Sequence, residues 1–285
     1  MTQELIRSLD EPSLDREKPV STTGQHVQFS FGKNWQKFLA RLDESHVAHA
    51  RRSFTAFTWL DTLDGHTFLD LGCGSGLSSL VAHRLGARRV VSVDVDPACV
   101  RCTEQVRARF AGSAGGWDIL RGSVLDREFL LSLRRFSYVY SWGVLHHTGA
   151  MWRALGNAST CVESGGLLHI ALYNEHKNSR AWHRVKRVCN RWPRTVFPAL
   201  RAAYVLVAYG RLLARLESPL AFTRQYRQRR GMDFWRDVED WLGGLPYEYC
   251  KPEQALDCLS ERGFVLQRLM TTSSIGNNEF LFRAT

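Results

Sequence analysis

Residues 68–76 read FLDLGCGSG, and this stretch decides the fold. An apolar run is followed by three glycines at alternate positions, Gly72, Gly74 and Gly76. A glycine-rich turn after a strand is typical of proteins that bind nucleotides. The spacing here is G-x-G-x-G, whereas the dinucleotide fingerprint is G-x-G-x-x-G. The loop therefore predicts a nucleotide-like ligand that is not a dinucleotide.

Strand-like and helical patterns alternate along the segment that contains this loop. The apolar runs expected to be strands are 67–71, 89–95, 117–121, 136–141 and 166–172. The runs with helical periodicity are 76–85, 97–110, 126–134 and 149–162, and later a helix at 252–262 is followed by strands near 263–270 and 278–283. This alternation predicts a mostly parallel α/β sheet with helices on both faces.

The domain organisation follows from where the alternation starts and stops. The chain has 285 residues, 44% of them hydrophobic, which is enough for one large core. Its expected segments are a disordered tail (1–24), an N-terminal helical cap (25–62), a ligand-binding core (63–173), a basic helical insert (174–245) and the end of the core sheet (246–285).

The positive charge is concentrated in the insert. Fourteen Lys and Arg against two acids lie between Asn174 and Gly231, a net charge of +12, whereas the whole chain carries +10. Such a balance suggests an acidic partner. The apolar stretch at 200–216 is interrupted by three arginines, so no transmembrane span is expected; it is a helix buried on one side or a surface-binding helix.

The cysteines argue against a metal site and a disulfide framework. The seven cysteines show no framework spacing, and the Cys99–Cys102 pair has no second pair to complete four zinc ligands. Reduced cysteines and a polar N-terminus without a signal-peptide pattern predict a cytoplasmic protein.

Two carboxylates indicate which chemical groups the ligand carries. Asp70 stands two residues before Gly72, where it would oppose a pyrophosphate but suit a cation. Asp94 ends the next strand, where a carboxylate can accept hydrogen bonds from ribose hydroxyls, while Asp96-Pro97 is typical of a helix N-cap. A ribose, a cation and no phosphate together describe S-adenosylmethionine.

In combination, these motifs resemble the class I S-adenosylmethionine-dependent methyltransferases, and especially their branch of quinone-ring and natural-product O-methyltransferases. The resemblance is carried by residues 70–76, 93–94, 136–147 and 164–168. It implies a Rossmann-like fold with a doubly wound, seven-stranded, mostly parallel sheet, covered by N-terminal helices and by the insert as a lid. One departure is Gly122-Ser123-Val124, where many members carry Gly-Asp plus a small residue.

The resemblance also implies a set of residues that contact the cofactor. Asp70 would hold the methionine end, the glycines would let the backbone approach, Asp94 would hold the ribose, and Ser123 with Val124 would flank the adenine. The expected cofactor-binding residues are Asp70, Gly72, Cys73, Gly74, Gly76, Asp94, Val95, Ser123, Val124, Trp142 and Trp35.

Methyl transfer is an in-line displacement, so the protein must position the nucleophile and remove its proton if it is a hydroxyl. His146 and His147 follow the fourth strand and are candidate bases, although one of them could instead brace the loop or cap the next helix. Tyr173 and Asn174 end the fifth strand and are expected to face the acceptor, with Tyr173 as the third candidate catalytic residue.

The expected function is methylation of a small-molecule acceptor, anionic or aromatic, in secondary metabolism or cofactor biosynthesis, with oxygen favoured over nitrogen. The alternatives for the basic insert are a solvated face, a tRNA or rRNA surface, and an anionic membrane surface that presents a lipid-like acceptor. A protein that binds S-adenosylmethionine without catalysis is a further alternative. The sequence leaves the oligomeric state open.

Overall fold

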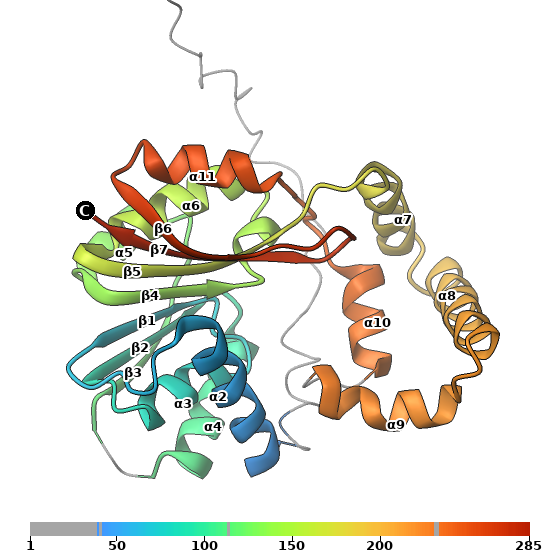
Figure 1. The fold of residues 1–285 in the computed structure, drawn as a ribbon, viewed down its shortest axis with the longest axis horizontal. Coiled ribbons are helices and arrows are strands. Elements are labelled where there is room, and N and C mark those ends of the chain that lie inside the picture. The colour runs from blue at the N-terminus through green and yellow to red at the C-terminus, as the bar shows by residue number, and fades with distance from the viewer. Residues whose placement is uncertain (1–38, 40–41, 113–114, 231–233) are drawn as a thin grey trace, which may run out of the picture.

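A single seven-stranded sheet organises the computed structural model, which describes residues 39, 42–112, 115–230 and 234–285 (Figure 1). The strand order is β3-β2-β1-β4-β5-β7-β6, in which β1 to β5 run parallel and β7 is antiparallel to both of its neighbours. The bounds are β1 Thr67–Leu71, β2 Arg89–Asp94, β3 Trp117–Arg121, β4 Phe136–Trp142, β5 Val162–Tyr173, β6 Phe264–Met270 and β7 Asn277–Ala284. This topology confirms the predicted fold class.

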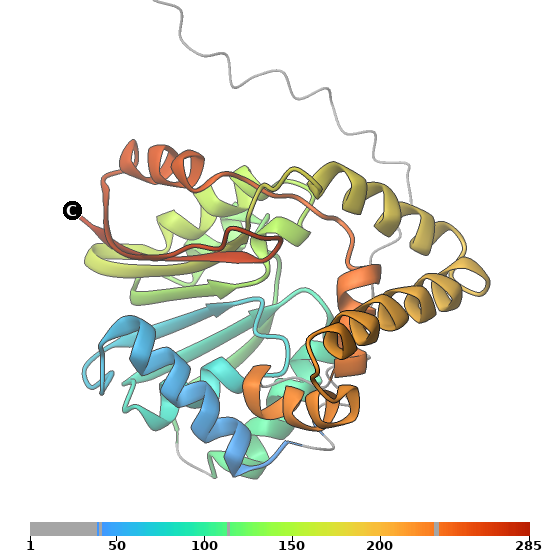
Figure 2. The same ribbon diagram turned by 45° about the vertical axis from the view of Figure 1, so that its right-hand side comes forward.

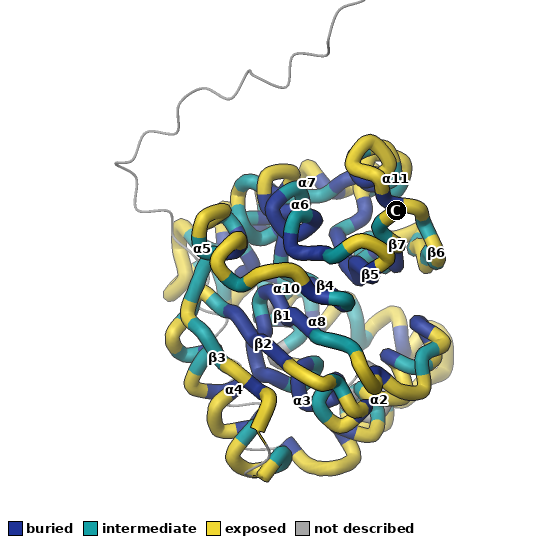
Figure 3. Tube along the Cα trace, turned by 90° about the vertical axis from the view of Figure 1, so that its left-hand side faces the viewer, coloured by how far each residue is buried: buried dark blue, intermediate teal, exposed yellow. Residues whose placement is uncertain are grey.

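Helices cover both faces of the sheet. One face packs against α2 (Glu44–Thr58), α3 (Leu77–Arg84) and α4 (Pro97–Phe110). The other packs against α5 (Arg127–Ser132), α6 (Met151–Thr160) and α11 (Pro252–Ser260). Figure 3 shows the central strands in the dark blue of buried residues, whereas β3 and β6 at the two edges are partly exposed. The two apolar layers therefore sandwich the sheet.

The helix α2 begins and ends at clear local signals. The Asp43 carboxylate accepts hydrogen bonds from the backbone N–H groups of Ser45 and His46, which caps the N-terminus. Trp59 adopts a left-handed conformation at the C-terminus. Residues 25–38 and 40–41 of the predicted N-terminal cap, with Trp35, lie outside the described residues.

The basic insert forms a lid of four helices with a small core of its own. They are α7 (Ser179–Arg191), α8 (Val196–Ala214), α9 (Pro219–Arg230) and α10 (Phe234–Gly243). The side chains of Cys189, Val205, Phe234, Val238 and Leu242 are buried together. Figures 1 and 2 show these helices beside the carboxyl ends of the parallel strands, the edge at which open α/β sheets bind ligands.

Candidate functional site

A cavity of about 2400 Å³ lies between the carboxyl ends of the strands, α2 and the lid. Its volume is more than twice that of an ordinary ligand pocket, which is roughly 300–1,000 Å³. Its wall contains residues of the glycine loop, of α2, of all the central strand ends and of the lid helices α8, α9 and α10. The cavity therefore has room for two ligands side by side.

The glycine loop turns tightly because its glycines adopt left-handed backbone angles, with φ of 82° at Gly72 and 80° at Gly76. A side chain at Gly72 would collide with Val144, and one at Gly76 would come within 2.9 Å of the Thr103 Cα. These two glycines thus let the loop pack against its own chain. Gly74 connects the loop to the end of β2, because its N–H donates to an oxygen of Asp94 at 3.0 Å.

Asp94 ends β2 with both carboxylate oxygens held in place. Its Oδ2 accepts from the Gly74 N–H, and its Oδ1 accepts from the Asp96 N–H at 2.9 Å. Each carboxylate oxygen keeps a second lone pair that can accept from a ligand hydroxyl. Asp96 instead accepts from the Ala98 N–H at 2.8 Å and caps α4, which has Pro97 in its first turn. The predicted role of Asp96 as the cap of α4 is confirmed, and the role of Asp94 toward a ribose stays a prediction.

Asp70 is 2% exposed and is the final acceptor in a chain of buried hydrogen bonds. Its Oδ2 accepts from the Ser79 hydroxyl at 2.6 Å, which lies 2.6 Å from the Ser92 hydroxyl. The Trp117 indole N–H donates to Ser92. Burial raises the pKa of Asp70 to about 7, against the hydrogen bond from Ser79 that lowers it. A cation in the cavity would favour the charged form of this carboxylate.

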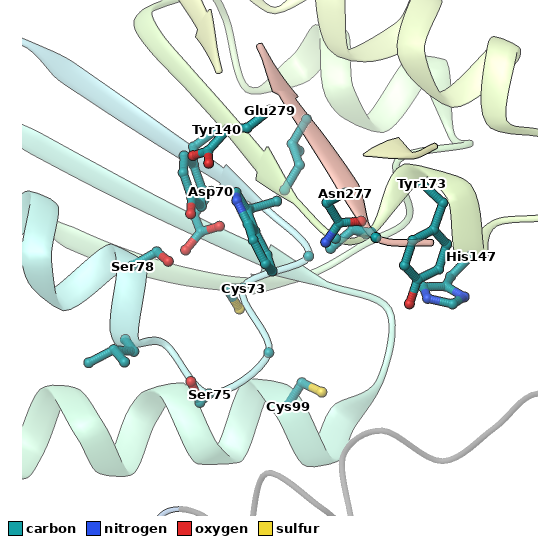
Figure 4. Close-up of a pocket in the computed structure, with 18 of the residues that line it drawn as sticks. Asp70, Cys73, Ser75, Ser78, Cys99, Tyr140, His147, Tyr173, Asn277 and Glu279 are labelled. Carbon is teal, nitrogen blue, oxygen red and sulfur yellow. The ribbon is translucent and has the colours of Figure 1, made fainter. Parts of the chain in front are cut away.

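A polar row that the sequence analysis missed continues from Asp70 across the sheet. Tyr140 is paired with Asp70 on β1 and with His169 on β5, and all three line the cavity under α2. The His169 ring donates from Nε2 to Glu279 at 2.7 Å and lies 2.8 Å from the Tyr138 hydroxyl through Nδ1. Figure 4 shows Asp70, Tyr140 and Glu279 on the same side of the cavity.

Glu279 therefore places a second carboxylate on the side of the cavity where Asp70 lies. The signal for it was present in the strand pattern, since Glu279 is an acid directly before the apolar residues 280–282 and shares a sheet face with Leu281. The sequence does not show that this face turns toward the cavity.

The residues expected around an adenine and an adenosine all contribute to the cavity wall. Val95, Ser123, Val124 and Trp142 all line it, with Val95 and Trp142 about half exposed, at 48% and 46%. Ser123 accepts from the Leu125 N–H through its hydroxyl oxygen, which leaves its O–H able to donate. Cys73 also lines the cavity, with its thiol 3.3 Å from the Thr103 hydroxyl.

His147 also lines the cavity, where the turn after β4 meets the segment that follows the lid. It belongs to a short 3₁₀ turn, Leu145–His147, and its Nδ1 donates to the carbonyl oxygen of Pro246. Burial lowers the pKa of His147 to about 4, so the imidazole is neutral near pH 7. In the tautomer that donates from Nδ1, the lone pair is on Nε2. Figure 4 shows the Tyr173 hydroxyl beside the His147 ring.

His146 does not share this position. It is fully buried and lies outside the cavity wall, with its ring packed 3.8 Å from the Tyr173 ring, centroid to centroid. Its Nδ1 accepts from the Tyr173 N–H at 3.3 Å, and burial holds its pKa well below the usual range. This geometry removes His146 as a candidate base and makes it a support for Tyr173.

Asn174 also differs from expectation, because its side chain does not face the acceptor. Its amide donates to the carbonyl oxygens of Thr272 and Ser274 and accepts from Asn278. The side chain thus fastens the end of β5 to the loop before β7. Tyr173, by contrast, lines the cavity.

Aromatic side chains from the lid form the wall near Tyr173. Trp241 lies edge-on to it, and Trp182 packs against Trp241 at 5.2 Å between ring centroids. Tyr247, which follows the lid, is tilted against Tyr173 outside the cavity wall. Behind them, the fully buried Lys186 donates to the Trp241 carbonyl and lies over the Trp241 and Tyr247 rings. This buried cation lowers the pKa of His147 further.

A methyltransferase domain model matches residues 41–210, which is more than half of the chain. The chain belongs to the methyltransferase domain family. Its fold is shared with magnesium protoporphyrin IX methyltransferase from Synechocystis PCC 6803 with bound SAH, at a TM-score of 0.53 and 13% identity over 90% of this chain and 95% of that one.

Shorter matches link this methyltransferase to curated relatives. A ribosomal protein L11 methyltransferase from Alteromonas mediterranea is 51% identical over 49 residues, and one from Tolumonas auensis is 47% identical over 47 residues. These matches cover 16% of this chain and 17% and 16% of the relatives. The chain thus spans about a sixth of the length of the curated relatives it matches.

The cofactor of this class I methyltransferase is S-adenosylmethionine, and the cavity residues fit it. Asp70 and Glu279 would hold its cationic methionine end, and Asp94 would accept hydrogen bonds from the ribose hydroxyls. Ser123 and Trp142 also line the cavity and would contact the adenosyl group. When bound, the cofactor supplies an electrophilic methyl group. Among the described residues, no group of three or more His, Cys, Asp or Glu could hold a metal ion, and all seven cysteines are free.

Proposed function

We propose that this methyltransferase methylates a hydroxyl group of a small, partly aromatic acceptor, with His147 as the general base. The observation that carries the proposal is the orientation of His147 at the lid end of the cavity. Its Nδ1–H donates to the Pro246 carbonyl, so the neutral imidazole carries its basic lone pair on Nε2. Proton removal by a positioned histidine contributes roughly 10²–10⁴-fold to a rate.

The wall around His147 supports an aromatic acceptor. Tyr173, Trp182, Trp241 and Tyr204 line this end, and aromatic rings prefer edge-to-face neighbours of this kind. Residues of the lid helices line the cavity, which favours a ligand that the lid can cover. These features support a small molecule.

The position of the insert cations does not favour RNA as the acceptor. Of the insert cations whose side chains are described, only Arg211 lines the cavity, beside Arg121, Arg153 and Arg268 from outside the insert, and most of the other described insert cations are exposed. A polynucleotide acceptor would need cations that lead into the cavity, because phosphate contacts position nucleic acids.

The first test is calorimetric titration of S-adenosylhomocysteine into wild type and Asp94→Ala, followed by an acceptor screen. We expect wild type to bind and the variant to lose most of its affinity. With phenols, other hydroxyl acceptors, amines and RNA, S-adenosylhomocysteine release should occur with a phenol or alcohol and fall sharply in His147→Asn. Release with amines or RNA alone would reject the proposed acceptor class.

A further inference from the structure

The lid helix α8 turns an apolar surface toward solvent. Before Arg211, every exposed residue of this described helix is uncharged and apolar, and Leu213 continues the stripe. We call these residues the α8 face: Pro198, Ala199, Ala202, Ala203, Leu206, Val207, Gly210 and Leu213. Leu206 is 71% exposed and Leu213 is 61% exposed. Surface helices ordinarily turn their polar side outward, so this arrangement calls for a partner.

The opposite side of α8 holds the helix on the lid. Val205 and Leu212 are buried, and the Arg201 guanidinium forms an ion pair with Glu239 of α10 at 2.6 Å. Figure 1 shows α8 at the outer edge of the molecule, on the far side of the lid from the sheet. By length and composition this helix could cross a membrane, and only 6% of its most apolar window is buried inside the protein. A spanning position would break these lid contacts and carry Arg201 into the lipid.

Cations stand at both ends of the α8 face. Arg191 and Arg194 precede the helix, Arg215 follows it, and all three are exposed. Beyond Arg215, the side chains of Leu216 and Leu220 are 96% and 68% exposed and extend the apolar surface. Between Lys177 and Gln225 the sequence has one acid, Glu217. An apolar stripe with an arginine rim is the pattern of a helix that lies in a membrane interface.

We propose that the α8 face docks the protein onto an anionic lipid membrane, with α8 lying flat in the headgroup region. The leucines and valine would enter the acyl boundary, and the arginines would contact lipid phosphates. Juxtamembrane cations are attracted by anionic lipids, and apolar side chains gain from leaving water. A helix of 19 residues would lie along about 28 Å of the surface.

Other partners fit this surface less well. A second copy of the chain would bring its own net +12 insert against the first, and like charges would repel. The eight residues of the α8 face also fall short of the roughly 20–30 residues a side in a stable protein interface. RNA would use the arginines, but aliphatic side chains provide neither hydrogen bonds nor stacking surfaces for bases.

The test is vesicle flotation with phosphatidylcholine vesicles, with and without phosphatidylglycerol, at low and moderate salt. Wild type should float with the anionic vesicles and much less with phosphatidylcholine alone. Leu206→Ser/Leu213→Ser should weaken binding at least about tenfold. The matched control is Leu131→Ser/Val265→Ser, which changes two side chains of similar exposure, 54% and 53%, outside the lid, and it should float like wild type. Unchanged S-adenosylhomocysteine affinity would show that each variant is folded.

Arg191→Gln/Arg194→Gln supplies the charge test, and it should reduce flotation and its salt dependence together. Three results would overturn the proposal. The first is no flotation of wild type with anionic vesicles, and the second is equal flotation of wild type and the leucine variant. The third is that light scattering finds wild type to be a dimer and the leucine variant to be a monomer. The last would assign the α8 face to a second copy. Salt-sensitive RNA binding without vesicle binding would assign the arginines to nucleic acid.

Discussion

The Nδ1 atom of His147 lies 2.5 Å from the carbonyl oxygen of Pro246, a residue 99 positions later in the chain. This hydrogen bond ties the turn after β4 to the segment that leaves the lid. It sets the orientation of the imidazole and assigns its proton to Nδ1. The assembly of the acceptor end of the cavity thus depends on a contact between the sheet and the lid.

Replacing His147 by asparagine should separate its two roles. The asparagine amide can still donate to Pro246 from near the Nδ1 position, whereas the base at Nε2 is lost. We expect kcat to fall roughly 10²–10⁴-fold with little change in thermal stability. In His147→Ala both activity and stability should fall, because the Pro246 carbonyl loses its donor. Steady-state kinetics and thermal melts measure both effects; full activity in the asparagine variant would exclude His147 as the base.

Replacing Asp94 by asparagine should weaken the cofactor without unfolding the loop. The amide oxygen can still accept from Gly74 or Asp96, but charge-assisted hydrogen bonds to ribose hydroxyls are lost. Hydrogen bonds to charged groups contribute about 1.5–3 kcal/mol, so the Kd for S-adenosylhomocysteine should rise roughly 10- to 100-fold. The control is Asp96→Asn, which keeps the cap of α4 and should bind nearly like wild type in the same calorimetric titration. Equal losses in both variants would contradict the assignment.

Cofactor affinity should depend on the protonation of Asp70. Burial raises the pKa of Asp70 from 3.8 to about 7, so the carboxyl is increasingly protonated below neutral pH. The charged form attracts the cationic methionine end, and the affinity should therefore rise with pH through about 7. Asp70→Asn should bind more weakly and lose this dependence. Titrations across that pH range check both points, and an unchanged slope in the variant would show that another group is responsible.

The same carboxyl should make the ligand-free protein less stable at higher pH. The folded state holds the Asp70 proton more tightly than the unfolded state, whose pKa is near 3.8. The contribution of Asp70 to the free energy of unfolding is therefore present at low pH and is lost as the pH rises through about 7. Urea unfolding of wild type and Asp70→Asn at several pH values isolates it. A difference that grows in the opposite direction would contradict the raised pKa.

The glycine loop offers a packing test. Gly76→Ala places a methyl group against the Thr103 backbone at a φ of 80°, whereas Gly112→Ala places one in open space at a φ of 67°. The left-handed backbone alone costs about 1–2 kcal/mol, and overpacking adds about 1–3 kcal/mol. Gly76→Ala should thus be the less stable variant in urea unfolding. Equal losses would mean that the loop yields to the methyl group at no cost.

Much of the core could be predicted because its signals are local. The strand bounds at β1 and β3 and the helix at 97–110 match the predicted ranges, since apolar periodicity and the Asp96-Pro97 cap are written in adjacent residues. The fifth strand begins earlier than predicted, at Val162, because Val162 pairs with Phe136 of β4 before a bulge, after which the pairing resumes at Leu167. The places of Asp70 and Asp94 follow from the strand ends in the same way.

Other parts of the site depend on residues that are distant in sequence. The Glu279 carboxylate meets His169 across 110 positions, and the Asn174 amide meets Ser274 across 100. Strand order and register bring these pairs together, and no local pattern encodes either. The insert was predicted as helical and basic, but its outward apolar face emerges only when the lid core is known.

The sequence by itself determined the α/β sheet, the glycine loop and the carboxylates that describe the cofactor, because periodicity, turn chemistry and strand ends act over a few residues. Only the tertiary structure decided between two adjacent histidines. The 3₁₀ turn points His146 under Tyr173 and His147 into the cavity, and the contact with Pro246 holds that rotation. Two neighbouring histidines thereby have different roles: His146 is a buried support and His147 is a candidate base. The direction of each side chain depends on what packs around the turn.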